Sequence, residues 1–260
     1  MQSQTQLPWA SGPAEILRHG LSLLKGDSDT NRRLAMISID NAVELMTKTY
    51  LGLPKRITNL EISRREFTEI SESFPALLDA LERYAPEKLT GIDLGTIEWY
   101  HRLRNQLYHQ GNGLTVERDK VEIYAELANL LFQNLFGIPL VSKATTTSEL
   151  LGDFIQLWVD LERSLTALVA RGKKPDPDSD RPRPVLETMR LLQKGNLFSS
   201  AEIAELNALR TLRNEVMHGT HSDFHTLVTR DTINRLRKIV ARLKQVEKDS
   251  DGTAKTDGSQ

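Results

Sequence analysis

Two short segments of the chain place an arginine, an asparagine and a histidine at the same spacing. The two sets are Arg104, Asn105 and His109, and Arg213, Asn214 and His218. An imidazole can accept or donate a proton near neutral pH, and a guanidinium matches a phosphate group through paired hydrogen bonds. Residues of these types in this pattern therefore indicate proton transfer beside a bound phosphate.

Cleavage of RNA by attack of its own 2′-hydroxyl needs three kinds of group. A base must take the proton of that hydroxyl, an acid must protonate the 5′-oxygen, and positive charge must stabilise the phosphorane. One Arg-Asn-x-x-x-His motif supplies one imidazole and one guanidinium, so two motifs facing each other would supply two of each. We therefore predict a composite site, in which the motif does not decide whether His109 or His218 is the acid.

The two motifs belong to longer matching stretches. In each half, the His is followed closely by glycine, then by a Val-x-Arg-Asp sequence and a further helical pattern. Arg213 follows Arg104 by 109 positions and Arg230 follows Arg118 by 112, so the second connecting loop is three residues longer. Matching segments in the same order with one small loop difference indicate a duplication.

The elements that must position these residues are helices. Apolar residues recur at three- and four-residue steps over residues 34–53, 150–169, 203–216 and 233–246, and no comparable run alternates with a period of two. Glycine just after each motif His predicts that both motifs end a helix. Asn and His, four residues apart, would share one helix face, which places a neutral hydrogen-bonding group one turn before the imidazole.

Several local signals predict where helices begin and end. Ser63 with Glu66, and Ser199 with Glu202, have the spacing of a capping box, which predicts a helix start at each serine. Pro75 is expected to kink or divide the helical pattern around it.

The domain organisation follows from composition. Residues 137–147 and 171–184 have the composition of linkers or loops. We expect one helical domain over residues 10–144, a second over residues 145–247, and a disordered tail over residues 248–260. The expected fold class is all-α, with two related antiparallel helical bundles packed as an intramolecular pseudo-dimer or as part of a homodimer.

Composition excludes several classes of protein. The chain has 260 residues, 39% of them hydrophobic, which is enough for two cores, and its formal net charge is −1. The absence of cysteine excludes disulfides, thiolate nucleophiles and Cys-ligated metals. No apolar run is long enough to span a membrane and no secretory signal is evident, so we expect a cytoplasmic protein without a membrane partner, metal or cofactor.

Near-zero net charge means that any nucleic acid must be held by a local patch. Arg235, Lys238 and Arg242 fall at helical spacing near the end of the chain and could form a basic stripe along one helix. A solvated helix face is the commoner meaning of such a pattern, but the stripe could also follow an RNA backbone.

The duplicated Arg-Asn-x-x-x-His motif, on a helix of an all-helical unit, resembles the signature of HEPN domains, the higher eukaryotes and prokaryotes nucleotide-binding superfamily. The segment Ile39 to Leu45 is similar to the long opening helix of such domains. The resemblance implies bundles that dimerise through the motif helix and, in active members, metal-independent endoribonuclease activity. It also implies that the arginines hold the scissile phosphate, that the histidines are catalytic, and that the asparagines orient them.

Two functions remain open at this level. The first is an endoribonuclease that acts as a toxin or phage-defence effector, with RNA as substrate and an antitoxin or defence-system protein as partner. The second is a non-catalytic module of HEPN type that binds a nucleotide, RNA or a partner protein. A purely structural interpretation, with a helix-end His that caps backbone carbonyls and an Arg on a solvated face, is less favoured because the pattern occurs twice.

Overall fold

The computed structural model divides the chain into two compact units, unit 1 over residues 1–145 and unit 2 over residues 146–260. It describes residues 7–26, 28–109, 115–140, 146–171, 189, 192–194, 197–218 and 226–254. Throughout these residues the regular structure is helical, without a strand, so the predicted all-α class is confirmed. Each unit is described by itself below.

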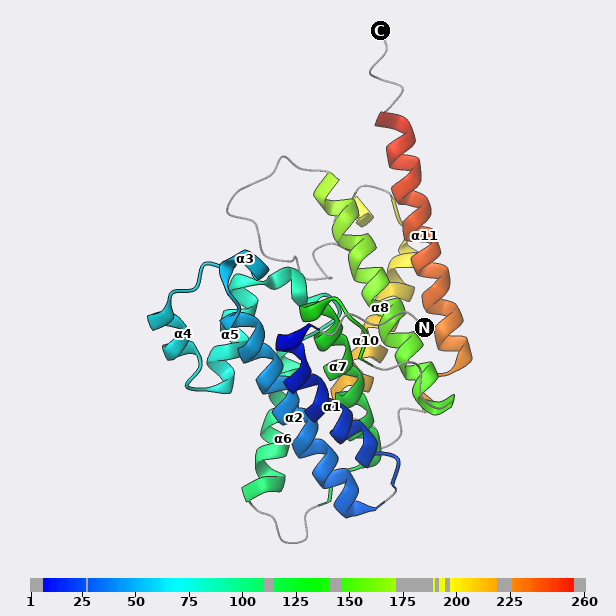
Figure 1. The fold of residues 1–260 in the computed structure, drawn as a ribbon. Helices are drawn as coiled ribbons and strands as arrows, with labels where there is room; N and C mark the ends of the chain where they lie inside the picture. The colour runs from blue at the N-terminus through cyan, green and yellow to red at the C-terminus, as the bar shows by residue number, and fades with distance from the viewer. Residues whose placement is uncertain are drawn as a thin grey trace, which may run out of the picture. The chain divides into compact units, whose positions relative to one another are not determined.

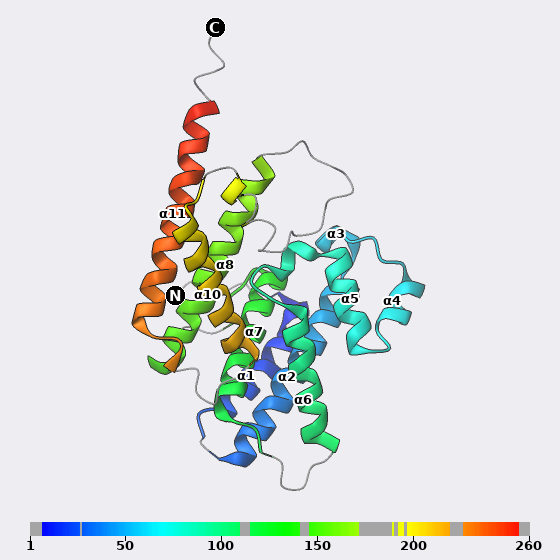
Figure 2. The same ribbon diagram turned by 180° about the vertical axis from the view of Figure 1, so that it is seen from behind.

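Unit 1 is built from two short 3₁₀ turns and seven α-helices (Figure 1). They are η1 (Pro8–Ala10), α1 (Ser11–Leu23), α2 (Asp29–Gly52), α3 (Lys55–Thr58), α4 (Arg64–Ile70), α5 (Phe74–Tyr84), η2 (Pro86–Leu89), α6 (Leu94–His109) and α7 (Arg118–Phe136). The long helix α2 packs against α1, α5, α6 and α7. Figure 2 shows α6 alongside α2 from the opposite side of the molecule.

The core of unit 1 forms around α2. Its buried apolar residues Met36, Ile39, Val43 and Met46 recur at three- and four-residue steps and are fully inaccessible to solvent. Helix α1 approaches α2 closely at Gly20, where a Cβ atom would lie only 2.9 Å from the side chain of Ile39. This dense packing fixes the face that α2 turns toward the neighbouring helices.

Helix starts in both units agree with the predicted signals. Ser63 caps α4 by accepting a hydrogen bond from the backbone N–H of Glu66. Pro75 divides the helical pattern, because it lies in the first turn of α5, where its missing N–H removes no helical hydrogen bond. At Ser199 the capping box of α10 is reciprocal, since the Ser199 hydroxyl accepts from the Glu202 N–H and the Glu202 carboxylate accepts from the Ser199 N–H.

Unit 2 contains three long helices among its described residues, α8 (Thr146–Arg171), α10 (Ser200–His218) and α11 (Arg230–Ala254) (Figure 1). Helix α8 packs along α11, and α10 also contacts α11. The apolar residues Phe154, Trp158, Leu236 and Leu243 are buried in this packing. Neither unit contains a described helix with the length and apolar character needed to cross a membrane.

The last helix is longer than the sequence predicts. Helix α11 continues to Ala254, so a disordered tail that begins at residue 248 is wrong for residues 248–254. Once a helix is nucleated, each added residue gains a backbone hydrogen bond, so a helix can continue into residues of low intrinsic helix propensity. Residues 255–260, and the predicted loop at 172–184, lie outside the described residues.

Candidate functional site

Both motifs lie at the carboxyl end of a helix, as predicted. Helix α6 ends at His109 and α10 ends at His218. Partial negative charge at a helix carboxyl end favours a protonated imidazole, which suits a proton donor. The side chains of these two histidines lie outside the described residues.

The arginine and asparagine of each motif make the same local hydrogen bond. Arg104 Nη1 donates to Asn105 Oδ1 at 2.9 Å, and Arg213 Nη1 donates to Asn214 Oδ1 at 3.2 Å. The amide oxygen that was expected to orient an imidazole therefore accepts from the neighbouring guanidinium. In both units the asparagine acts as a positioning residue for the arginine.

The guanidinium of Arg104 is also held by helix α2. Its Nε lies 3.1 Å from Oδ2 of Asp40, and its Nη2 donates to the side-chain oxygen of Asn41. Each terminal nitrogen of a guanidinium carries two hydrogens, so these contacts leave one N–H on Nη1 and one on Nη2. With its side chain 18% exposed, Arg104 is oriented by the protein and keeps two donors, the number that a bidentate phosphate contact uses.

Asp40 is a fully buried carboxylate at the centre of a polar cluster in unit 1. Its Oδ1 accepts a 2.7 Å hydrogen bond from the Tyr124 hydroxyl of α7, and its Oδ2 lies 2.9 Å from Nδ1 of His101. Burial, followed by the negative charge of Asp40 and the hydrogen bond to it, raises the pKa of Tyr124 well above its ordinary value. Tyr124 therefore remains a hydrogen-bond donor to Asp40 at physiological pH.

His101 joins this cluster from helix α6. Its ring packs against Phe74 of α5, with the ring centroids 4.3 Å apart, and its side chain is 13% exposed. The Asp40–His101 cluster, which we define as Asp40, His101, Arg104 and Tyr124, therefore joins helices α2, α6 and α7. Of these residues the sequence analysis assigned a role only to Arg104.

One signal in the sequence could have pointed to the missed residues. Asp40 follows Ile39 in a helical stretch and lies four residues after Met36 and three before Val43, at a position that the periodicity places toward the core. A buried carboxylate requires partners, and His101 precedes the motif arginine by one helical turn. Their sequence separation, however, gives no way to pair them before the fold is known.

The corresponding positions in unit 2 carry different residues. The offset of 109 that relates the motifs pairs His101 with Arg210, and the offset of 112 after the loop pairs Tyr124 with Leu236. Leu236 is fully buried, and the described residues of unit 2 include no buried carboxylate. Arg213 itself is only 6% exposed. Unit 2 thus repeats the Arg–Asn hydrogen bond without the imidazole and phenol of the Asp40–His101 cluster.

The predicted basic stripe is largely paired with acidic residues of the same unit. Arg235 binds both carboxylate oxygens of Glu205, at 2.7 and 3.1 Å, and Arg242 Nε lies 3.0 Å from Glu202. The hydrogen bond from Arg235 lowers the pKa of Glu205, so this carboxylate stays charged. Two of the three basic residues therefore join α10 to α11. RNA binding by Arg235, Lys238 and Arg242 stays a prediction, and the positive charge of the stripe is more compensated by carboxylates than the sequence suggests.

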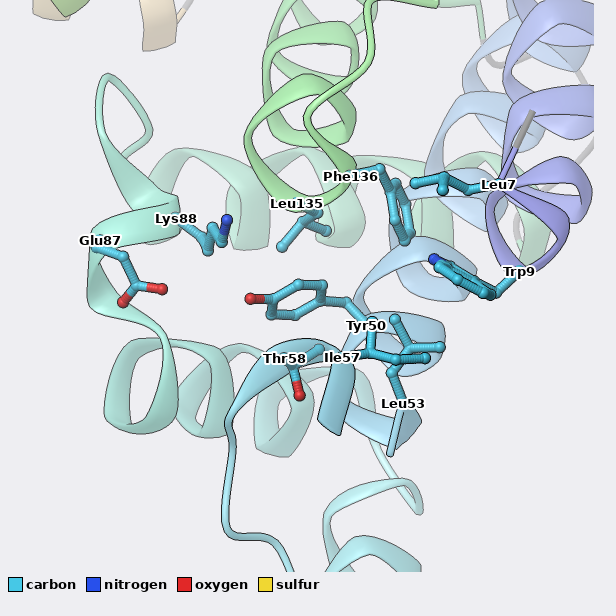
Figure 3. A pocket seen from close by; sticks show the side chains of 10 residues that line it. All are labelled: Leu7, Trp9, Tyr50, Leu53, Ile57, Thr58, Glu87, Lys88, Leu135 and Phe136. Carbon is cyan, nitrogen blue, oxygen red and sulfur yellow. The ribbon is translucent and has the colours of Figure 1, made fainter. Parts of the chain in front are cut away.

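Unit 1 also has a pocket of about 320 Å³, away from the motif residues (Figure 3). Trp9 and Phe136 supply apolar walls, and the Tyr50 hydroxyl points toward the side formed by Glu87 and Lys88. Burial, and then the negative charge of Glu87, raises the pKa of Tyr50 to about 12. Tyr50 is therefore neutral at physiological pH.

Comparisons with known proteins found no match among family models, curated proteins or solved structures. Within the described residues, no three potential metal ligands lie close enough to hold an ion. The candidate site consequently consists of the two motifs and the Asp40–His101 cluster. The pairing of the two units, as a pseudo-dimer or through a homodimer, stays a prediction.

Proposed function

We propose that the protein is a metal-independent endoribonuclease of HEPN type, acting as a toxin or phage-defence effector. The observation that carries this proposal is the hydrogen bond from arginine to asparagine at the end of a helix, which recurs in two separately packed units. A surface arginine with no function would have no reason to be held in the same way twice. The nearly buried positions of Arg104 and Arg213 add to this support.

The proposed reaction needs no group beyond those of the protein and the RNA. One imidazole accepts the 2′-proton, and O2′ then attacks the phosphorus. The guanidinium stabilises the five-coordinate phosphate, and a second imidazole gives its proton to the leaving 5′-oxygen. The products are a 2′,3′-cyclic phosphate and a 5′-hydroxyl.

The test is RNA cleavage in the presence of EDTA by the native chain and by Arg104→Ala, His109→Ala, Arg213→Ala and His218→Ala. We expect the native chain to leave 2′,3′-cyclic phosphate ends and at least the unit 1 variants to lose cleavage by about 100-fold or more. Arg102→Ala is a matched control, because this arginine lies on α6 but its exposed side chain pairs only with Glu98. Equal cleavage by all variants, or none by the native chain, would overturn the proposal.

One observation favours the non-catalytic alternative. Asp40 lies 3.1 Å from Arg104 Nε, so its negative charge partly compensates the positive charge of the guanidinium. A partly compensated guanidinium stabilises the extra negative charge of a phosphorane less well, but this loss matters less for simple binding of a phosphate. A binding module would retain RNA in a filter-binding assay, lose retention on Arg104→Ala, and release no cleaved product.

A further inference from the structure

We propose that His101, oriented by Asp40, is the proton acceptor of the reaction, so that unit 1 alone supplies the base. The inference rests on the proposed function and deepens it by adding a catalytic residue that neither motif contains.

The contact with Asp40 selects the nitrogen that can accept a proton. Asp40 Oδ2 lies 2.9 Å from His101 Nδ1, and a carboxylate can only accept a hydrogen bond, so Nδ1 carries the hydrogen. In the neutral ring the lone pair then belongs to Nε2. The same carboxylate stabilises the imidazolium that forms when Nε2 takes up a proton.

The position of His101 places this base beside the phosphate-binding arginine. His101 Nδ1 and Arg104 Nε approach the same oxygen of Asp40, at 2.9 and 3.1 Å. His109 follows His101 by eight residues on the same helix, which is a rise of about 12 Å between their Cα atoms. Arg104 lies between these two histidines in the sequence of α6.

The surroundings hold the ring in place. Phe74 packs on the imidazole from α5, and Tyr124 from α7 fixes the other oxygen of Asp40. Among the described residues, Asp40 binds His101 directly, and Arg104 and Tyr124 are linked to it through the two oxygens of Asp40. A base held by packing and by hydrogen bonds on its supporting carboxylate needs little reorganisation to react.

Unit 2 cannot supply the same base. Arg210 occupies the position that corresponds to His101, and Leu236 the one that corresponds to Tyr124. A guanidinium does not release its proton at physiological pH, so it cannot accept one from a 2′-hydroxyl. Unit 2 therefore has no counterpart of His101 as a base beside its motif arginine.

In the resulting step, His101 Nε2 takes the proton of the 2′-hydroxyl while the O2′–P bond forms. The P–O5′ bond breaks and O5′ receives a proton from His109. Both imidazoles regain their starting protonation by exchange with water. No oxidant, metal or further reactant is required.

The decisive variant is His101→Asn. The asparagine amide nitrogen can replace Nδ1 as the donor to Asp40, but asparagine offers no counterpart of Nε2. We expect kcat for RNA cleavage in EDTA to fall by about 10²–10⁴-fold with KM nearly unchanged. Circular dichroism and thermal unfolding should match the native chain, and the control Arg102→Ala should keep kcat within a few-fold.

An RNA with sulfur in place of the bridging 5′-oxygen separates base from acid, because a thiolate leaves without protonation. We expect His109→Ala to recover cleavage of this substrate and His101→Asn to stay slow. The reverse result would overturn the assignment of His101 as the base. As a readout without turnover, the Hδ1 proton of His101 should be visible by NMR and lost in Asp40→Asn; its absence in the native chain would overturn the orientation.

The two proposals fail in different ways. If His101→Asn cleaves RNA at the native rate while Arg104→Ala does not, the role of His101 is overturned and the proposed function stands. If the native chain never cleaves RNA, both are overturned.

Discussion

Helices α6 and α10 carry the same Arg-Asn-x-x-x-His motif, but the two units differ in the side chains at the positions of His101 and Tyr124. In unit 1, Arg104 rests on a buried aspartate that also binds His101 and Tyr124. In unit 2, Arg213 makes the same bond to its asparagine, yet Arg210 and Leu236 stand at the positions of the imidazole and the phenol. The comparison teaches that a repeated motif can keep its local Arg–Asn hydrogen bond while the imidazole and phenol beside it are present in only one of the two units.

The largest expected effect on stability comes from replacing Asp40, the carboxylate that binds Arg104, His101 and Tyr124. Asp40→Ala leaves the Arg104 guanidinium without its buried counter-charge, and we expect the free energy of unfolding of unit 1 to fall by roughly 3–5 kcal/mol. Asp160→Ala is the matched control in unit 2, since Asp160 lies 4.0 Å from Lys244 near the surface and should cost less than about 1 kcal/mol. Hydrogen exchange of the α2 and α8 amides measures each unit separately, and equal losses would refute the contrast.

The next effect tests the phenol alone. Tyr124→Phe keeps the ring, which stacks on Tyr100 at 4.6 Å, but removes the donor to Asp40. We expect the free energy of unfolding of unit 1 to fall by about 1–3 kcal/mol, because the buried Asp40 oxygen loses its hydrogen-bond donor. Tyr108→Phe, at an exposed position of α6, should change little in the same denaturant titration. A neutral Tyr124→Phe would show that the hydroxyl does not support the cluster.

A smaller effect separates the two capping boxes. Ser199→Ala removes the hydroxyl that binds the Glu202 N–H, and we expect a loss of about 1 kcal/mol with faster hydrogen exchange in the first turn of α10. At Ser63 the box is not reciprocal, because the carboxylate of Glu66 bonds to Tyr84 instead. Ser63→Ala should therefore cost less than Ser199→Ala, and the opposite order would contradict this account of the caps.

The smallest effect concerns the paired basic stripe of unit 2. Since Arg235 lowers the pKa of Glu205 in the folded state, the pair stabilises the protein above the pKa of an unfolded glutamate. This stabilisation is lost as the pH falls through the lower, folded pKa of Glu205, and it should stay below about 1 kcal/mol because the pair is part-exposed. In Arg235→Leu, carboxyl NMR should show the Glu205 pKa moving up toward its ordinary value. No movement would mean that the ion pair does not form in solution.

Much of the fold could be predicted because its signals are local. The spacing of apolar residues identified the long helices, and glycine after each motif His correctly marked the ends of α6 and α10. Ser63, Pro75 and Ser199 act within one helical turn of their own positions, so their effect is readable from neighbouring residues. The length of α11 was missed because helix propagation depends on the preceding helix as well as on local composition.

The sequence by itself determined the all-α class, the helix-end placement of both motifs and the arginine and asparagine of each. Only the tertiary structure decided that Asp40 of α2 meets His101 and Arg104 of α6 and Tyr124 of α7, which lie 61 to 84 residues away in the chain. The physical reason is that a carboxylate becomes a buried hydrogen-bond acceptor only through the packing around it. The periodicity of α2 predicts that Asp40 faces the core, but it does not predict which side chains of other helices contact Asp40 there.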